Sequence, residues 1–236
     1  MNTKFFGASV TAAMLLTAAP ALAATIMFDD FSQDQTVVSV AYPGATDSST
    51  IAFTAPFGSG IGTRTLTVEN VTNNGNAVSA TTLEAQGGEL SFSNNDRATG
   101  TGTLTYTSVG DISHGPNPYM LFRLGSLGFD HVANFTATAT DTLGNVSSYF
   151  EVLVAGVDPK LYLSAFSGVA DFNSIATLSF EIDSSNVFGV GAVDRVDGSI
   201  TSIELSPVPL PASGLLLFGA LGGAAAMRRR KARKAA

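Results

Sequence analysis

The sequence predicts an all-β protein, an antiparallel β-sandwich of jelly-roll-like type, between an N-terminal signal peptide and a C-terminal transmembrane helix. Three observations support this fold class. Apolar and polar residues alternate with a period of two in many short stretches. Residues that tolerate positive φ, mainly Gly, Asn and Asp, separate these stretches at intervals of about 8–14 residues. The middle of the chain has no strand–helix–strand pattern of the kind that a parallel sheet needs.

The first element is a leader at residues 1–23. Lys4 precedes an apolar run, a proline interrupts this run, and the small residues Ala21 and Ala23 follow. This is the pattern of a secretory signal peptide, and it predicts cleavage by signal peptidase between Ala23 and Ala24. An uncleaved anchor helix is the alternative, which is disfavoured because the run is short for a bilayer. The protein is therefore expected to be exported.

The second element, residues 24–206, is expected to be an acidic ectodomain. It holds 5 basic and 19 acidic residues, which gives it a net charge of −14. Such a surface repels nucleic-acid phosphates and anionic lipids, so nucleic acid is excluded as a partner. The chain has no Cys, which excludes thiol catalysis and Cys-bound zinc. The domain must therefore be held together by its core alone.

About eleven strands are expected in this domain. The clearest alternation places Leu178, Phe180 and Ile182 between polar neighbours. The expected strands cover residues 25–31, 36–42, 49–54, 65–68, 89–93, 103–107, 135–141, 147–154, 161–166, 177–182 and 200–205. Segment 114–127 contains prolines and glycines, and it is expected to be a long loop.

Standard catalytic motifs are missing from the sequence, including the nucleophile elbow, the phosphate-binding loop and the zinc-protease pattern. The two histidines, His114 and His131, each lie close in sequence to an acid, Asp111 or Asp130. We expect a structural or solvated role for both histidines, and metal binding or catalysis is the alternative. No pair of carboxylates stands out as one that would hydrolyse a glycosidic bond. The sequence therefore predicts a protein that is not an enzyme.

Asp29 and Asp30 form the one candidate metal site. Adjacent acids in a strand point to opposite faces, and both are costly inside a core. A structural Ca²⁺ bound by Asp29 or Asp30, together with a loop acid such as Asp171 or Asp183, would offset that cost. The alternative is an edge strand whose acids are solvated. No other cofactor is expected.

The third element covers residues 207–236. An extended motif precedes the apolar run 213–227, and a basic tail at 228–236 closes the chain. The motif consists of Val208, Pro209, Leu210, Pro211 and Ala212, and the tail begins with Arg228, Arg229, Arg230 and Lys231. As a helix with snorkelling arginines, the run can span a membrane, and the basic tail places the ectodomain on the far side. A buried core helix is the alternative, which is disfavoured because the run has no polar face.

This tail resembles the PEP-CTERM sorting signal in its VPLPA variant, because it combines a Pro-containing motif, a short Gly/Ala/Leu helix and an Arg-rich end. The resemblance implies processing by an exosortase, a membrane-embedded Cys transpeptidase of Gram-negative bacteria that often make exopolysaccharide. Pro209 and Pro211 would then belong to the recognition motif. The resemblance also implies export across the inner membrane, anchoring through the tail, and a final place at the cell surface or in the extracellular biofilm matrix.

These features favour an exported, exosortase-sorted surface or matrix protein with a non-catalytic structural or adhesive role. The alternative is a carbohydrate-binding module that acts on exopolysaccharide, since jelly-roll sandwiches commonly present aromatic residues to sugars. The chain offers no Trp and 5 Tyr for this purpose. A hydrolase is the least supported of the three classes.

Overall fold

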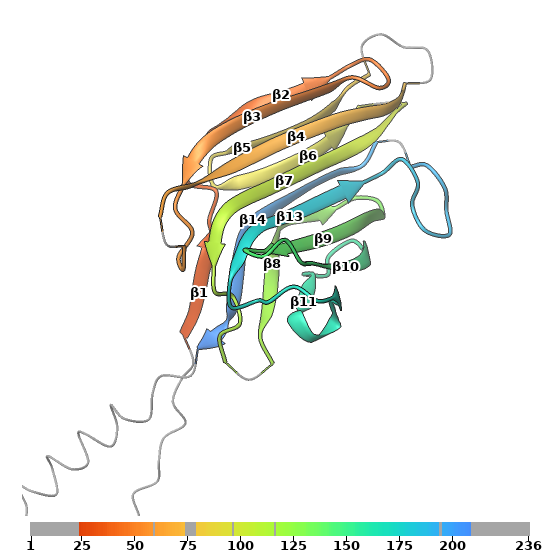
Figure 1. Cartoon of the computed structure of the whole chain (residues 1–236). Coiled ribbons are helices and arrows are strands. Elements are labelled where there is room, and N and C mark those ends of the chain that lie inside the picture. The colour runs from red at the N-terminus through yellow and green to blue at the C-terminus, as the bar shows by residue number, and fades with distance from the viewer. Residues whose placement is uncertain are drawn as a thin grey trace, which may run out of the picture. The chain divides into compact units, whose positions relative to one another are not determined.

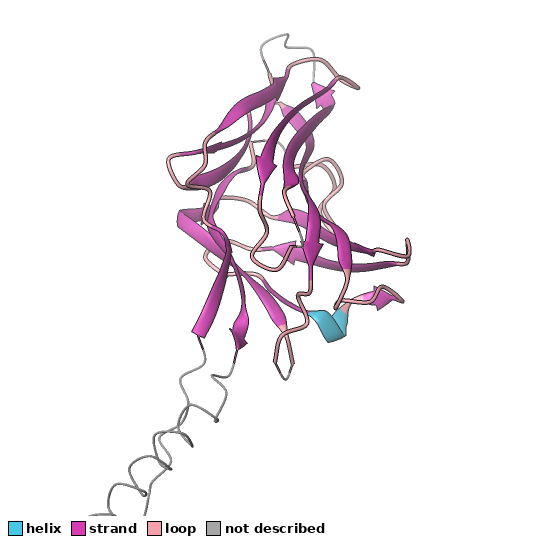
Figure 2. Cartoon of the chain, turned by 60° about the vertical axis from the view of Figure 1, so that its left-hand side comes forward, coloured by secondary structure: helices cyan, strands magenta, loops and turns pink. Residues whose placement is uncertain are grey.

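The computed structural model describes residues 24–208 except residues 59, 74–78, 96, 116 and 194. Within this part of the chain nearly all regular structure is β-strand, and one short 3₁₀ helix interrupts it (Figures 1 and 2). No helix in the described residues is long and apolar enough to cross a membrane. The predicted signal peptide, the predicted transmembrane helix 213–227 and the basic tail lie outside these residues.

The secondary structure follows the chain in this order: β1 (Ala24–Asp29), β2 (Gln35–Val40), β3 (Thr46–Phe53), β4 (Gly62–Asn73), β5 (Thr81–Gln86), β6 (Glu89–Asn94), β7 (Ala98–Gly110), β8 (Tyr119–Phe129), β9 (Ala133–Asp141), β10 (Val146–Leu153), β11 (Lys160–Tyr162), the 3₁₀ helix η1 (Leu163–Ala165), β12 (Ser167–Gly168), β13 (Ile175–Asp183) and β14 (Asp197–Val208).

Two seven-stranded antiparallel sheets make up the domain (Figure 1). The first sheet has the order β11-β8-β14-β6-β5-β2, with β1 also paired to β14, and the second has the order β12-β10-β9-β13-β7-β4-β3. The chain changes sheets repeatedly, between β2 and β3, β4 and β5, β6 and β7, β7 and β8, β8 and β9, β10 and β11, β11 and β12, and β13 and β14, which gives jelly-roll-like connectivity. The predicted all-β antiparallel sandwich is confirmed.

The core lies between the two sheets, and aromatic rings fill its centre. Phe122 of the first sheet meets Phe180 of the second sheet edge-on, with ring centroids 4.8 Å apart. Phe135 packs against both rings, at 5.2 Å from Phe122 and 6.1 Å from Phe180. All three side chains are buried. Every second side chain of a strand points to the same face, and in these strands the apolar side chains point inward. Their burial between the sheets holds the two sheets together.

A buried ion pair joins β1 to the second sheet. Arg64 is fully buried, and its Nη1 lies 3.0 Å from Oδ2 of Asp29. The Arg64 Nε donates to Oε1 of Gln35 at 2.9 Å, and its Nη2 donates to the carbonyl oxygen of Gln33. Tyr106 Oη donates to Asp29 Oδ2 at 2.6 Å. Every charged atom of the pair therefore has a partner, as burial of charge requires.

Burial and the neighbouring Asp29 carboxylate raise the pKa of Tyr106 well above its ordinary value. The Tyr106 phenol therefore stays protonated, and its O–H remains available to the carboxylate at neutral pH.

The predicted loop at 114–127 is wrong from Tyr119 onward, because β8 begins there. Its glycines indicated a loop, but they serve the strand. A Cβ on Gly125 would lie 1.9 Å from the Ser199 hydroxyl, and Gly128, which directly follows the predicted loop, has φ +59°. Register shifts between β8 and β14 occur at these points. The glycines thus mark bulges in a paired strand.

Other strand predictions also need correction. β5 was missed because Ala and Glu are weak strand formers, although Thr81, Leu83 and Ala85 alternate as buried residues. The strand predicted at 161–166 ends at Tyr162, and η1 follows it. At the end of the domain, β14 continues to Val208, where it pairs with Ala24 of β1. The observed sheet therefore extends two residues beyond the predicted boundary at 206.

Candidate functional site

The second sheet turns a face covered with hydroxyl groups away from the core. On β4, β7, β9 and β13, buried apolar residues alternate with half-buried Thr and Ser, so the hydroxyl side chains share the outer face. We call this surface the hydroxyl face. It consists of Thr63, Thr65, Thr67, Thr101, Thr103, Thr105, Thr107, Thr136, Thr138, Thr140, Thr177 and Ser179.

The strand register sets these hydroxyl groups side by side. Thr65 lies opposite Thr105, Thr105 opposite Ser179, and Ser179 opposite Thr138. The oxygen atoms of Thr105 and Ser179 are 3.1 Å apart. Thr63 and Thr107 make a second such contact, also at 3.1 Å. Each hydroxyl has acceptor capacity beyond its cross-strand bond, so the face can exchange hydrogen bonds with a polar ligand.

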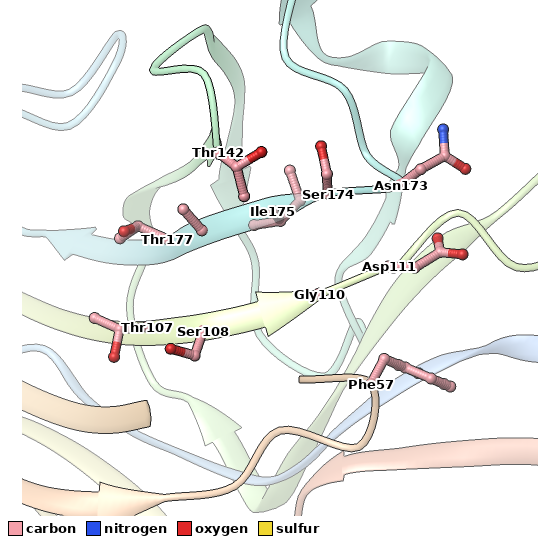
Figure 3. A pocket seen from close by; sticks show the side chains of 11 residues that line it. Phe57, Thr107, Ser108, Gly110, Asp111, Thr142, Asn173, Ser174, Ile175 and Thr177 are labelled. Atoms are coloured by element: carbon pink, nitrogen blue, oxygen red, sulfur yellow. The ribbon is translucent and has the colours of Figure 1, made fainter. Parts of the chain in front are cut away.

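A cleft of about 640 Å³ opens where the hydroxyl face reaches the ends of β7 and β13 (Figure 3). Thr107 and Thr177 belong to both surfaces. Three further segments complete the cleft: the segment around Phe57, the turn at Thr142 and the loop ahead of β13. The lining residues are Phe57, Thr107, Ser108, Gly110, Asp111, Thr142, Asn173, Ser174, Ile175, Ala176 and Thr177. The cleft combines one aromatic ring with hydroxyl, amide and carboxylate groups.

Glycine at position 110 allows the Phe57 segment to close one side of the cleft. Gly110 has φ +85°, and a Cβ there would lie 2.0 Å from the carbonyl oxygen of Phe57. The backbones of Phe57 and Gly110 form an isolated parallel bridge. The Phe57 ring in turn packs against His114, with ring centroids 4.1 Å apart. Only glycine permits this close backbone approach.

Hydrogen bonds tie the loops of the cleft into one rim. The Ser113 hydroxyl lies 2.7 Å from Oδ1 of Asp111 and 2.6 Å from Oδ1 of Asn173. Asn173 Nδ2 donates to Asp171 Oδ1 at 2.6 Å, and the Asp171 amide donates to Asp141 Oδ2 at 3.0 Å. The rim is thus positioned before any ligand binds, which lowers the ordering cost of binding.

The rim carries negative charge. Hydrogen bonds from the Asn173 side chain and amide lower the pKa of Asp171. The Asp171 amide, followed by the Asn145 side chain, lowers the pKa of Asp141 to about 2. Both groups are therefore ionised at neutral pH. The rim favours neutral or cationic ligands over anionic ones.

We expect the Asp141 carboxyl to titrate near pH 2, whereas an unfolded Asp titrates near pH ~3.9. Because the folded pKa is the lower one, the stability that this group contributes is present above pH ~4 and is lost as the pH falls through 2. NMR titration of the carboxyl carbon measures the midpoint directly. The Asp141→Asn variant should lose this part of the acid dependence, and a wild-type midpoint near pH ~3.9 would contradict the assignment.

The structure separates the predicted metal ligands. Asp29 is buried in the pair with Arg64, and Asp30 is exposed, as expected for opposite faces of a strand. Arg64 and Tyr106 bind the Asp29 carboxylate. Asp171 and Asp183 instead bind the loops that follow them. The described residues contain no cluster of three or more metal-ligating side chains. Calcium binding stays a prediction.

The two histidines occupy different places. His114 lies beside the cleft through its contact with Phe57. His131 is exposed, with Nδ1 3.2 Å from Oδ1 of Asp130. Sequence reasoning missed the cleft itself, because its lining comes from four separated segments. The predicted sorting residues 209–212, the residues Ala21 and Ala23 and the basic residues 228–231 lie outside the described part of the chain.

Comparison with known proteins gives distant likenesses to solved structures. No protein-family model and no curated protein matches the sequence. The family 11 carbohydrate-binding module of a cellulosomal cellulase of Clostridium thermocellum matches with 13% identity and a TM-score of 0.39, over 79% of this chain and 96% of that chain. An exo-beta-agarase matches with 15% identity and a TM-score of 0.42, over 79% of this chain.

A protein named PfGH50B matches with 14% identity and a TM-score of 0.38, over 61% of this chain. This chain spans about a quarter of the length of PfGH50B and of the agarase, 23% and 25% respectively. Likenesses at these TM-scores carry no argument about this protein. Its class, an antiparallel β-sandwich with an open polar cleft, is defined by its own strands and side chains.

Proposed function

We propose that this chain is an exported cell-surface protein whose β-sandwich binds polysaccharide without cleaving it. The open cleft beside the hydroxyl face is the observation that supports this proposal. Sugar hydroxyls need both donors and acceptors, which Thr107, Thr177 and Asn173 supply. The apolar C–H face of a sugar ring can pack on Phe57. A few placed polar groups beside an apolar surface are typical of a small-molecule or oligosaccharide site.

Binding is favoured over hydrolysis because the lining of the cleft does not offer a pair of carboxylates. Glycoside hydrolysis requires two carboxyl groups on opposite sides of the bond that is cleaved. Asp111 is the only acid among the residues that line the cleft, and the rim acids Asp141 and Asp171 accept hydrogen bonds from amides of the loops that form the rim. The structural or adhesive role expected from the sequence would then consist of holding a glycan in place.

Export and sorting form the second part of the proposal, and they rest on the leader and on the VPLPA-type tail. The leader and the tail both carry basic residues that favour the cytoplasm. The two ends of the domain should therefore both lie at the far side of the membrane. The pairing of Ala24 with Val208 is consistent with this arrangement. Signal peptidase and an exosortase would be the processing partners. A chain recovered from the cytoplasm with Met1 retained would end this part of the proposal.

We expect the full-length chain to bind neutral oligosaccharides on a glycan array, and Asn173→Ala to weaken the strongest of these interactions about tenfold or more. The Asn173 side chain is exposed at the cleft, so its loss removes ligand contacts and the rim hydrogen bonds to Ser113 and Asp171, and it leaves the core unchanged. Calorimetric titration with that oligosaccharide measures the effect.

The matched control is Asn186→Ala, because Asn186 is also exposed but does not line the cleft. This control should bind like the wild type. Absence of any signal above background on the array, or equal loss in both variants, would contradict the proposal.

A further inference from the structure

The outer face of the first sheet carries an exposed aromatic and cationic group that the cleft does not use. On β8 and β11, Met120 and Leu161 point inward and are fully buried. Their neighbours Tyr119, Tyr162 and Lys160 therefore face outward. Tyr119 and Tyr162 are register partners, with ring centroids 5.5 Å apart. We call these three residues the tyrosine platform.

Lys160 lies over both rings of the platform. Its Nζ is 3.8 Å from the ring centroid of Tyr119 and 5.0 Å from that of Tyr162. This arrangement is a cation–π interaction, which favours a position of the ammonium group above the two rings. The hydrogen bond to Tyr162 also raises the pKa of Lys160, so the group remains charged at neutral pH.

Lys160 differs from the other cations near it in having no acidic partner. Arg123 binds Asp158 at 3.1 Å and Glu204 at 3.3 Å. Among the ion pairs of the described residues, none includes Lys160. In a domain with a net charge of −14, the ammonium group of Lys160 thus attracts no carboxylate among the described residues. It offers a binding point for an external anion.

We propose that the tyrosine platform is a second glycan site, which binds a sugar unit that carries a carboxylate or another acidic group. Lys160 would pair with the acidic group, and the exposed Tyr162 ring, 41% accessible, would pack on the sugar ring. Asp158 and Glu204 lie beside Arg123 and keep further acceptor sites for sugar hydroxyls.

The proposal of a second site rests on the proposed function, and it extends that function to acidic glycans. The negative rim of the cleft disfavours such ligands, so the two sites would have different ligand preferences. Because they lie on the outer faces of different sheets, one chain could hold two polysaccharide strands. Two sites on one rigid domain cross-link polymers and raise the overall avidity.

The test compares an oligosaccharide of galacturonic acid with the neutral galactose oligosaccharide of equal length, in titrations of the full-length chain. Lys160→Gln should weaken binding of the acidic probe about tenfold, and Lys160→Arg should largely restore it. Raising the salt concentration to about 1 M should remove most of the difference, because screening shortens the range of the attraction. Binding of the neutral probe should not change.

Arg97→Gln is the matched control, because Arg97 is an exposed cation away from the platform. Equal loss in Arg97→Gln and Lys160→Gln would indicate a general charge effect and overturn the second site. Failure of the acidic probe to bind the wild type would also overturn it. Asn173→Ala separates the two proposals, since it should weaken only the neutral probe. If Asn173→Ala loses only the binding of the neutral probe, the second site is independent of the cleft, as proposed.

Discussion

Replacing Arg64 with methionine should lower the free energy of unfolding by about 3–5 kcal/mol. The substitution keeps much of the side-chain volume but removes the charge that faces Asp29. The Asp29 carboxylate would then stay buried with only the Phe31 amide and the Tyr106 hydroxyl as partners. Removal of one member of a buried pair costs more than the pair contributes, because the other charge is left without compensation.

Urea-induced unfolding of the full-length chain measures this change. Arg123→Met is the matched control, because the Arg123 side chain is 48% exposed and its ion pairs should be worth only about 0–1 kcal/mol. The double variant Asp29→Leu/Arg64→Met should be more stable than Arg64→Met alone. A cost below about 1 kcal/mol for Arg64→Met would contradict the buried ion pair.

Phe180→Ala should be destabilising by about 3–5 kcal/mol. Phe180 lies in the second sheet and is 2% exposed, and its ring touches Phe122 of the first sheet. Phe135 and Tyr106 surround the ring from the same sheet. Truncation to alanine would leave a cavity between the sheets and remove the aromatic contacts that join them.

The comparison for this prediction is Phe188→Ala, because Phe188 is 77% exposed. This variant should change the free energy of unfolding by no more than about 0.5 kcal/mol. Thermal and denaturant unfolding measure the free energy of unfolding of both variants. Similar stability in the two variants would mean that the sheets do not pack through Phe180.

The strict alternation in the sequence predicted the strands at the centre of the second sheet. At β13, Leu178, Phe180 and Ile182 all point into the core, as their parity required. The same parity also indicates a buried charge in β4. Arg64 shares the inward parity of Leu66 and Val68, so the pattern already indicated a buried charge that would need a partner.

Features that depend on distant contacts could not be predicted. Pro118 and Gly125 indicated a loop, because nothing local shows that β14 pairs with this segment and requires glycine there. The partner of Asp29 lies 35 residues away in sequence, and therefore a bound cation seemed the way to offset its burial. The cleft likewise forms only when β7, β13 and the Phe57 segment come together.

The hydroxyl face was partly visible in the sequence. The alternating threonines at 103, 105 and 107 indicated a half-buried strand with its hydroxyl groups on one face. Their alignment with Ser179 and Thr138 on other strands depends on register, which the alternation alone does not define. The sequence thus predicted the composition of this surface but not its extent or its cleft.

The most direct test of a glycan-binding second sheet is NMR mapping of backbone amide shifts as a neutral oligosaccharide is added to the full-length chain. We expect the largest shifts at Thr107, Asp111, Asn173 and Thr177, with smaller shifts along the hydroxyl face. Shifts confined to β5, β6 and β14 of the first sheet, or no shifts at saturating oligosaccharide, would contradict the account.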